Sequence, residues 1–277
     1  MRPDEFYRQF TARNEGLVPG PVQEALRVTP ILVAGCGSTG GAAIEPLARL
    51  GAERFILAEP GRYDLTNLNR QRAAVADVGH NKAEVAARWL AQVNPHARAE
   101  VHATGIAPDA PGRPGNALAL VRGAGAVIDG VDVTTAGGWR AKYALHAAAA
   151  TARRPVVSGY DLGGTQHVRY YDYPAGCPPL AGQVTEADVA AAARDGGALW
   201  PLLLRVVPRA VIPADLIADV RAGQGRPDYS APQLAYTAQL FGVLAARYVV
   251  QILAGHPVRP HLTIDVHKLV RPEGDTP

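Results

Sequence analysis

The stretch TPILVAGCGSTGG, residues 29–41, decides the fold of this chain. The segment from Pro30 to Ala34 carries no charge, which is typical of a parallel strand that is buried on both faces. A turn with the spacing G-x-G-x-x-G follows, formed by Gly35, Gly37 and Gly40. A fourth glycine, Gly41, comes directly after it. Backbone amides of such a turn approach a phosphate that the dipole of the following helix also favours. The stretch therefore predicts nucleotide binding, with tight strand–helix packing as the alternative that needs no ligand.

The next residues complete a βαβ unit. Residues 42–50 have helical apolar spacing and stop at Gly51, a usual residue after a helix end. RFILA, Arg54–Ala58, reads as a second buried strand that ends at Glu59. An acid at this place holds ribose hydroxyls in nucleotide-binding sheets, whereas a solvated residue is the alternative. The fold class predicted is a doubly wound, mostly parallel α/β sheet.

Composition limits the function classes. The chain has 277 residues, a formal net charge of +3 and 48% hydrophobic residues. It holds no run of about 18 consecutive apolar residues that could span a bilayer, and the segment MRPDEFYRQF is too charged for a signal peptide. Lys and Arg are scattered, without the basic patch of a nucleic-acid-binding protein. We expect a cytoplasmic protein that binds neither membrane nor nucleic acid.

Residues 60–82 depart from the pattern of a dinucleotide enzyme, because they form a long polar segment rich in Asn, Arg and Gln. With the glycine turn and Glu59, the words that follow in order are TNLNRQ (66–71), GHNKAE (79–84), VNP (93–95) and IDGVD (128–132). This order and spacing resemble the ThiF/MoeB/HesA family, the bacterial relatives of the E1 ubiquitin-activating adenylation domain. The resemblance implies an ATP- and Mg²⁺-dependent adenylyltransferase that converts a carboxylate to an acyl-adenylate and releases pyrophosphate.

The resemblance also assigns phosphate-binding residues. Arg70, in the N-R-Q word, and Lys82, in the G-x-x-K word, match the cations that contact the triphosphate. Asn67 and Gln71 match side chains that add hydrogen bonds near the ribose and phosphates. From the residues alone, Arg70 has the alternative of pairing with Asp64, and Lys82 that of a solvated first-turn residue of a helix.

The segment AGAVID, Ala124–Asp129, reads as a central strand. Its carboxyl end carries two acids, Asp129 and Asp132. Ligands of open α/β sheets gather at the carboxyl ends of such strands. In the family's D-x-x-D pattern the second acid is linked to magnesium, so Asp132 is the predicted metal ligand and Asp129 is expected to cap the loop. A helix over 134–152 and strands over Arg154–Tyr160 and Gly164–Tyr173 are expected next, the last leading toward the acceptor.

An arginine near the N-terminus of family members reaches the phosphates of the partner subunit. Arg13, in the word ARNEGL, is our preferred match, and Arg8, in YRQF, is the other. Either match implies a homodimer with an arginine acting in trans. The alternative is that both are surface arginines of a poorly ordered tail.

Resemblance weakens after Tyr173. Many members bind zinc through two C-x-x-C pairs, but this chain has only Cys36 and Cys177, so no zinc is expected. Cys177 lies in the Pro/Gly-rich loop YPAGCPPLAG, which favours exposure, and is a candidate nucleophile for a covalent intermediate. Cys36, inside the glycine turn, suits that place by its small size.

The chain is expected to be a single ThiF-type domain over 1–277. Its parts are an N-terminal arm and helix (1–28), the nucleotide-binding core (29–173), acceptor-side loops (174–230), and a C-terminal helix with an edge strand (231–277), the strand being HLTIDVHKL. His80, His261 and His267 receive no role. The expected acceptor is a peptide or the C-terminus of a small ubiquitin-like sulfur carrier.

Two other functions remain open at this point. An NAD(P)-dependent oxidoreductase fits the glycine turn and Glu59 but leaves the 66–71 word without a task. The second possibility is a catalytically inactive nucleotide-binding scaffold. It stays open because many family members have another acid two residues after the one that matches Glu59, and this chain has Gly61 there. Asp64 lies close enough in sequence to replace that acid.

Overall fold

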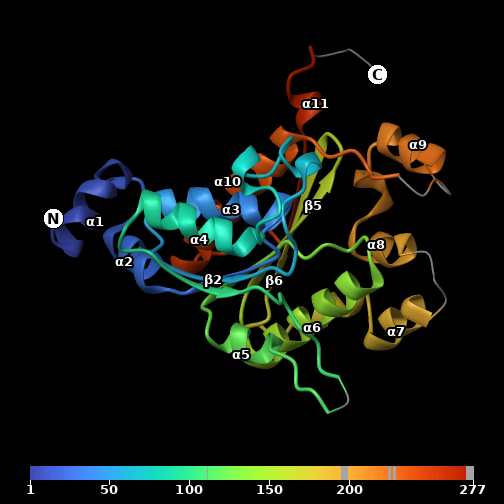
Figure 1. Cartoon of the computed structure of the whole chain (residues 1–277), viewed down its shortest axis with the longest axis horizontal. Helices are drawn as coiled ribbons and strands as arrows, with labels where there is room; N and C mark the ends of the chain where they lie inside the picture. The colour runs from blue at the N-terminus through green and yellow to red at the C-terminus, as the bar shows by residue number, and fades with distance from the viewer. Residues whose placement is uncertain (111, 195–198, 224–225, 227–228, 273–277) are drawn as a thin grey trace.

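A seven-stranded sheet forms the centre of the protein (Figure 1). The computed structural model describes residues 1–277 except 111, 195–198, 224–225, 227–228 and 273–277. Within the described residues the strand order is β3-β2-β1-β4-β5-β6-β7. The strands are β1 (Ile31–Ala34), β2 (Arg54–Ala58), β3 (Arg98–His102), β4 (Ala126–Asp129), β5 (Val156–Leu162), β6 (Thr165–Tyr171) and β7 (His261–Asp265). The first five strands run parallel and β6 and β7 join antiparallel, which confirms the predicted fold class.

The centre of the sheet is where β1 lies between β2 and β4. Every residue of β1 and β4 is buried, as the charge-free sequence of β1 and the apolar residues before Asp129 in β4 predict. Their register aligns Ala34 with Asp129, so both strands end at the same level. Chain connections leave this point in opposite directions, and the crevice between such strands is the usual ligand site of an open α/β sheet. The glycine turn after β1 and the acids after β4 therefore become neighbours.

Helices cover both faces of the sheet. The α-helices within the described residues are α1 (Pro3–Phe10), α2 (Gly20–Val28), α3 (Ser38–Arg49), α4 (Lys82–Val93), α5 (Ala117–Arg122), α6 (Ala136–Ala152), α7 (Glu186–Arg194), α8 (Trp200–Val206), α9 (Ala214–Gly223), α10 (Ala235–Leu253) and α11 (Val266–Leu269). One core is formed with α2, α3, α4 and α10, and the other with α5 to α9. None of these helices, within the described chain, is long and apolar enough to cross a membrane.

Local signals explain most element boundaries. Asn81 caps α4 by accepting from the backbone amides of Ala83 and Glu84. The predicted helices around α3, α4, α6 and α10 are confirmed, and the acceptor-side loops contain α7, α8 and α9. The segment HLTIDVHKL is a strand only as far as Asp265, whose side chain then accepts from the Lys268 amide and starts α11. The edge strand β3 was missed, because its sequence RAEVH mixes charged and apolar residues.

Candidate functional site

The glycine turn requires glycine for steric reasons. Gly35 has a φ of 84°, and a Cβ there would lie 2.3 Å from the carbonyl oxygen of Gly130. A Cβ on Gly40 would lie 2.0 Å from the carbonyl oxygen of Gly35. The turn thus packs against the backbone that follows β4. Helix α3 begins within the motif, at Ser38, and contains Gly40 and Gly41. Free amides at a helix N-terminus suit an anionic ligand.

Glu59 lies against this turn, as predicted. Its carboxylate accepts from the amides of Cys36 at 2.8 Å and Gly61 at 2.7 Å. A Cβ on Gly61 would lie 2.7 Å from Glu59 Oε1, so a second acid at 61 would displace the longer Glu59 side chain. The departure from the family pattern is therefore sterically matched to the glutamate. Cys36 is fully buried, and burial raises the pKa of its thiol well above the usual value.

Gln71 and Lys82 stand across from Gly37. Polar atoms of both side chains lie 3.8 Å from the place where a Gly37 Cβ would be. Lys82 opens α4 and is fixed there by Asn81, whose amide donates to the Glu59 carbonyl at 2.8 Å. Gln71 is buried, and its Oε1 has no hydrogen-bond partner among the described residues. Two segments of the predicted site thus meet at the turn.

Arg70 is partly buried near two acids. Burial lowers the pKa of its guanidinium, while the charges of Asp161 and Asp132 oppose that shift. Its Nη1 donates to Asn69 Oδ1 at 2.7 Å and to the Thr66 carbonyl, not to Asp64. Its Nε is buried and lacks a partner among the described residues. The guanidinium therefore has hydrogen-bonding capacity left for a ligand.

Asn67 and Asp64 close a turn of their own. Asn67 Oδ1 accepts from the Asp64 amide at 3.1 Å, and the Asn67 amide donates to the Asp64 carbonyl oxygen at 2.9 Å, which closes the 3₁₀ turn η2 (Leu65–Asn67). Asp64 is exposed. Replacement of the acid absent at Gly61 by Asp64 stays a prediction. Contact of Asn67 with a nucleotide stays a prediction.

Asp132 is exposed at the carboxyl end of the sheet, after β4. Its carboxylate accepts from the amide of Thr134 at 2.8 Å and from the Thr134 hydroxyl at 2.9 Å. Carboxylate oxygens retain further lone pairs in such an arrangement, so Asp132 can also bind a cation. Within the described residues, no group of three or more His, Cys, Asp or Glu side chains is placed to hold a metal ion by itself.

Asp129 is the centre of a buried network that the sequence did not indicate. Its carboxylate is fully buried and accepts from Lys142, from His146 at 2.9 Å and from Ser158 at 2.6 Å. Burial raises the pKa of Asp129, but Lys142 and His146 outweigh it and hold that pKa well below its usual value. Asp129 also caps the loop, as predicted, through Val131 N at 3.1 Å. Lys142 and His146, four residues apart in an Ala-rich helix, were the available signal.

Asp161 is a further acid that sequence reasoning missed. It follows the apolar segment of β5 and accepts from Ser38 Oγ at 2.8 Å and Thr39 Oγ1 at 3.4 Å, at the N-terminus of α3. Burial raises its pKa, and the second oxygen, Oδ1, has no partner among the described residues. The sequence signal for Asp161 was a single acid within the otherwise uncharged segment VVSGYDL.

The remaining predicted residues lie away from the turn. Arg8 and Arg13 are exposed on the arm, which contacts the far end of α3 through Asn14 and the Leu50 carbonyl. Since a helix of this length spans about 18 Å, both arginines are remote from the turn in their own chain, and Figure 1 places α1 and α9 at opposite ends. Cys177 is half-buried rather than exposed, and burial raises the pKa of its thiol.

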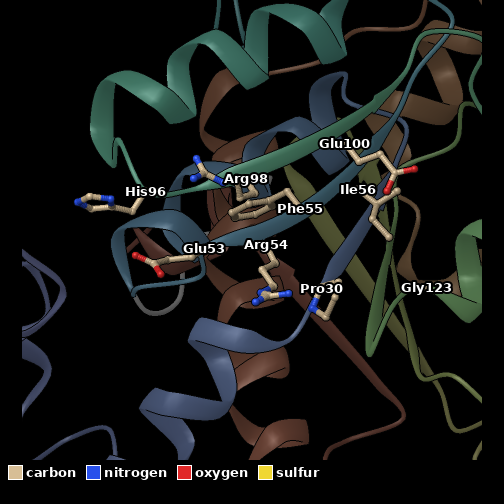
Figure 2. A pocket seen from close by; sticks show the side chains of 9 residues that line it. All are labelled: Pro30, Glu53, Arg54, Phe55, Ile56, His96, Arg98, Glu100 and Gly123. Atoms are coloured by element: carbon tan, nitrogen blue, oxygen red, sulfur yellow. The ribbon is translucent and has the colours of Figure 1, made fainter. Parts of the chain in front are cut away.

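A cavity of about 450 Å³ lies elsewhere (Figure 2). Its lining residues are Pro30, Glu53, Arg54, Phe55, Ile56, His96, Arg98, Glu100 and Gly123. Arg54 and Arg98 begin β2 and β3, so this cavity lies at the amino ends of the strands. The glycine turn and the acids lie at the carboxyl ends. We therefore locate the candidate site at the glycine turn and not in the cavity at the amino ends of β2 and β3.

Comparison with known proteins finds relatives of this chain. A model of the ThiF family matches residues 11–272. The chain is 31% identical over 157 residues to the probable adenylyltransferase/sulfurtransferase MoeZ of Mycobacterium tuberculosis, covering 56% of this chain and 37% of MoeZ. It is 29% identical over 157 residues to the sulfur carrier protein adenylyltransferase of Thermus thermophilus, covering 56% of this chain and 53% of that protein. The chain thus spans about half or less of these relatives.

Solved structures share the fold. E. coli tRNA N6-threonylcarbamoyladenosine dehydratase, crystallised in complex with ATP, superposes with a TM-score of 0.62 and 24% identity, over 92% of this chain and 98% of that chain. At this identity the likeness bears on the fold. The described sheet and its helices therefore have the architecture of proteins that carry a nucleotide in a crystal.

Proposed function

Because this chain belongs to the ThiF family, we propose that it is an ATP-dependent adenylyltransferase that activates a carboxylate as an acyl-adenylate. The observation that carries this proposal is the meeting of Gln71 and Lys82 at Gly37 of the glycine turn, with Arg70 next to Gln71 and near Asp161 and Asp132. Arg70 Nε and Gln71 Oε1 are buried without partners in the described chain. Buried polar atoms are normally hydrogen-bonded, so these atoms support a ligand that completes them. A triphosphate near a ribose fits this set.

The residues divide the work by position. Glu59 lies after β2 and accepts the ribose hydroxyls with the lone pairs that its two amide donors leave free. Lys82 and Arg70 place positive charge on the phosphates, and the N-terminus of α3 adds its dipole. An oxygen of the acceptor carboxylate bonds to the α-phosphorus while the bond to the bridging oxygen breaks, and pyrophosphate leaves with the electron pair. The cations stabilise the charge on this leaving group.

Asp132 is the residue that we assign to Mg²⁺. Its exposed carboxylate stands near Arg70, whose pKa responds to its charge. Bound magnesium would neutralise phosphate oxygens and orient them for in-line attack. A single protein carboxylate with several waters and phosphate oxygens is an ordinary magnesium environment.

The acceptor and the assembly are part of the same proposal. We assign the acceptor to peptides or to small ubiquitin-like sulfur carriers, and the curated name of the Thermus relative supports the second class. We assign Arg13, or else Arg8, to the site of a second copy, because the arm of each chain lies at the far end of its own α3. Cys177 stays a candidate nucleophile, although its raised pKa keeps the thiol protonated at neutral pH.

ATP–pyrophosphate exchange tests the proposal. The wild-type protein is assayed with Mg²⁺ and a panel of short peptides and carrier C-termini, beside Asp132→Ala. We expect exchange that depends on one class of carboxylate and falls by at least about 100-fold in the variant, because a phosphate-linked cation loses its protein ligand.

Asp109→Ala is the matched control, because Asp109 is exposed and also closes a turn, through the Gly115 amide at 2.7 Å. Its exchange rate should equal that of the wild type. Hydride transfer to NAD(P)⁺ without any pyrophosphate exchange would contradict the proposal and favour an oxidoreductase. ATP binding without exchange or hydride transfer would favour a scaffold.

A further inference from the structure

A chain of buried hydrogen bonds beside the candidate site has no part in the adenylation proposal. It begins at Asp129, whose Oδ2 accepts from Lys142, His146 and Ser158. All four side chains are at most 1% exposed. Lone buried charges are costly, so this group is stable only because its members satisfy one another.

The chain continues from His146 to Tyr173. His146 Nδ1 lies 2.6 Å from the Tyr173 hydroxyl, which also accepts from the Leu180 amide at 3.1 Å. An ionised Asp129 can only accept, so His146 Nε2 carries a proton and donates to it. In the neutral imidazole Nδ1 is then the acceptor, and the Tyr173 hydroxyl donates to it. Burial lowers the pKa of His146, which agrees with the neutral form.

One end of this chain holds a strained turn. Leu180 and Ala181 have φ values of 49° and 56°. Left-handed backbone is disfavoured for non-glycine residues because Cβ crowds the carbonyl oxygen, so the surroundings must hold it. The Tyr173 hydroxyl does so through the Leu180 amide, and Leu180 is fully buried. This turn belongs to the segment 173–182, which leads into the acceptor-side helices.

The other end of the chain forms a wall of the glycine turn. Asp129 Oδ1 accepts from the Val131 amide at 3.1 Å and so fixes the peptide at Gly130. A Cβ on Gly130 would lie 2.3 Å from the Gly40 amide and 3.0 Å from the Gly35 carbonyl oxygen. A small movement of this peptide therefore moves the glycine turn, since close-packed backbone cannot yield independently.

We propose that His146 and Tyr173 are positioning residues that couple the segment 173–182 to the glycine turn. The hydrogen bonds run without a break from Leu180 through Tyr173 and His146 to Asp129. A rearrangement of the strained turn changes the donor on the Tyr173 hydroxyl, and with it the hold on the peptide at Gly130. The conformation of the segment 173–182 and the order of the glycine turn are thereby linked. Only the ATP readout of the test rests on the proposed function.

Tyr173→Phe tests the coupling by removing one hydroxyl. Amide hydrogen exchange of the nucleotide-free protein is followed in peptides that cover 35–41 and 174–182. Loss of a buried hydrogen bond is worth about 1 kcal/mol, or about fivefold in an equilibrium constant. We expect exchange about fivefold faster in both peptides, and a dissociation constant for Mg·ATP raised by a similar factor.

Tyr171→Phe is the matched control. Tyr171 is as buried as Tyr173 and stacks on it with ring centroids 5.9 Å apart. Its hydroxyl faces Tyr160 and is not part of the hydrogen-bonded chain from Leu180 to Asp129. This variant should leave exchange in 35–41 and ATP affinity unchanged. A merely structural role of Tyr173 would lower the melting temperature and accelerate exchange near 174–182 alone, which would overturn the proposal.

His146→Gln keeps the inference testable if Tyr173→Phe folds poorly. The glutamine amide preserves a donor to Asp129 but removes the acceptor for Tyr173. It should reproduce the faster exchange in both peptides, and the double variant should add nothing, because both changes break one chain. Additive effects would overturn the coupling. A wild-type protein that fails to bind ATP would contradict the proposed function while the exchange result still decides this inference.

Discussion

Two polar regions at the carboxyl ends of the central strands differ in one property. Around Asp129, each carboxylate, imidazole, hydroxyl and ammonium group of the network has a hydrogen-bond partner. Around the glycine turn, buried atoms lack partners within the described residues: Arg70 Nε, Gln71 Oε1 and Asp161 Oδ1. Strand β5 serves both regions, since it carries Ser158 and Asp161. The satisfied region stabilises the fold, and the unsatisfied one is where a ligand is needed.

Asp129→Ala should have the largest effect. It leaves the Lys142 ammonium buried without its counter-charge, and such a change costs about 3–5 kcal/mol. We expect a large drop in the urea midpoint of unfolding, or a failure to accumulate folded protein. Asp132→Ala is the control, since an exposed substitution changes stability by about 0.5 kcal/mol or less. Equal stability of the two variants would show that the Asp129 network is not a structural unit.

Lys82→Ala should act on ligand binding instead. A charge-assisted hydrogen bond to phosphate is worth about 1.5–3 kcal/mol, so the dissociation constant for ATP should rise about 10- to 100-fold. Thermal unfolding without nucleotide should change little. Calorimetric titration measures the affinity, with Lys268→Ala, an exposed lysine on α11, as control. A large loss of stability with unchanged affinity for ATP would show that Lys82 stabilises the fold and does not bind the nucleotide.

Asp161→Asn should have the smallest effect, visible in the pH dependence of stability. Burial raises the pKa of Asp161, so the native state holds the proton more tightly than the unfolded chain and wild-type stability falls as pH rises above the ordinary value of 3.8. The variant lacks this decline and should be relatively more stable at pH 7. Melting temperatures from pH 3 to pH 7 measure the difference.

Asp188→Asn is the opposite control for that experiment. Hydrogen bonds from Thr185, helped by Arg205, lower the pKa of Asp188 to about 2. Wild-type stability from this group is present above 3.8 and is lost as pH falls toward about 2, so this variant should be less stable at pH 7. If both variants shift stability in the same direction at pH 7, burial does not raise the pKa of Asp161 in the folded protein.

Much of the site was predictable because its signals are local. The glycine spacing needs only steric arguments, and Asn81 caps α4 so that Lys82 stands at its first turn. β3 escaped prediction because an edge strand with one exposed face lacks a continuous apolar run. The missed residues, Asp161 and His146, are polar groups whose partners lie far along the chain.

The doubly wound sheet, the glycine turn and the residues expected to face it could be predicted from the sequence, because periodicity, glycine spacing and charge-free runs act over short distances. Which polar atoms find hydrogen-bond partners depends on the tertiary structure. His146 and Tyr173 are 27 residues apart, and Ser38 and Asp161 are 123 apart. Burial and hydrogen bonding are settled between such distant segments when the sheet and its helices pack, and so the division between the satisfied network and the open site is a property of the fold.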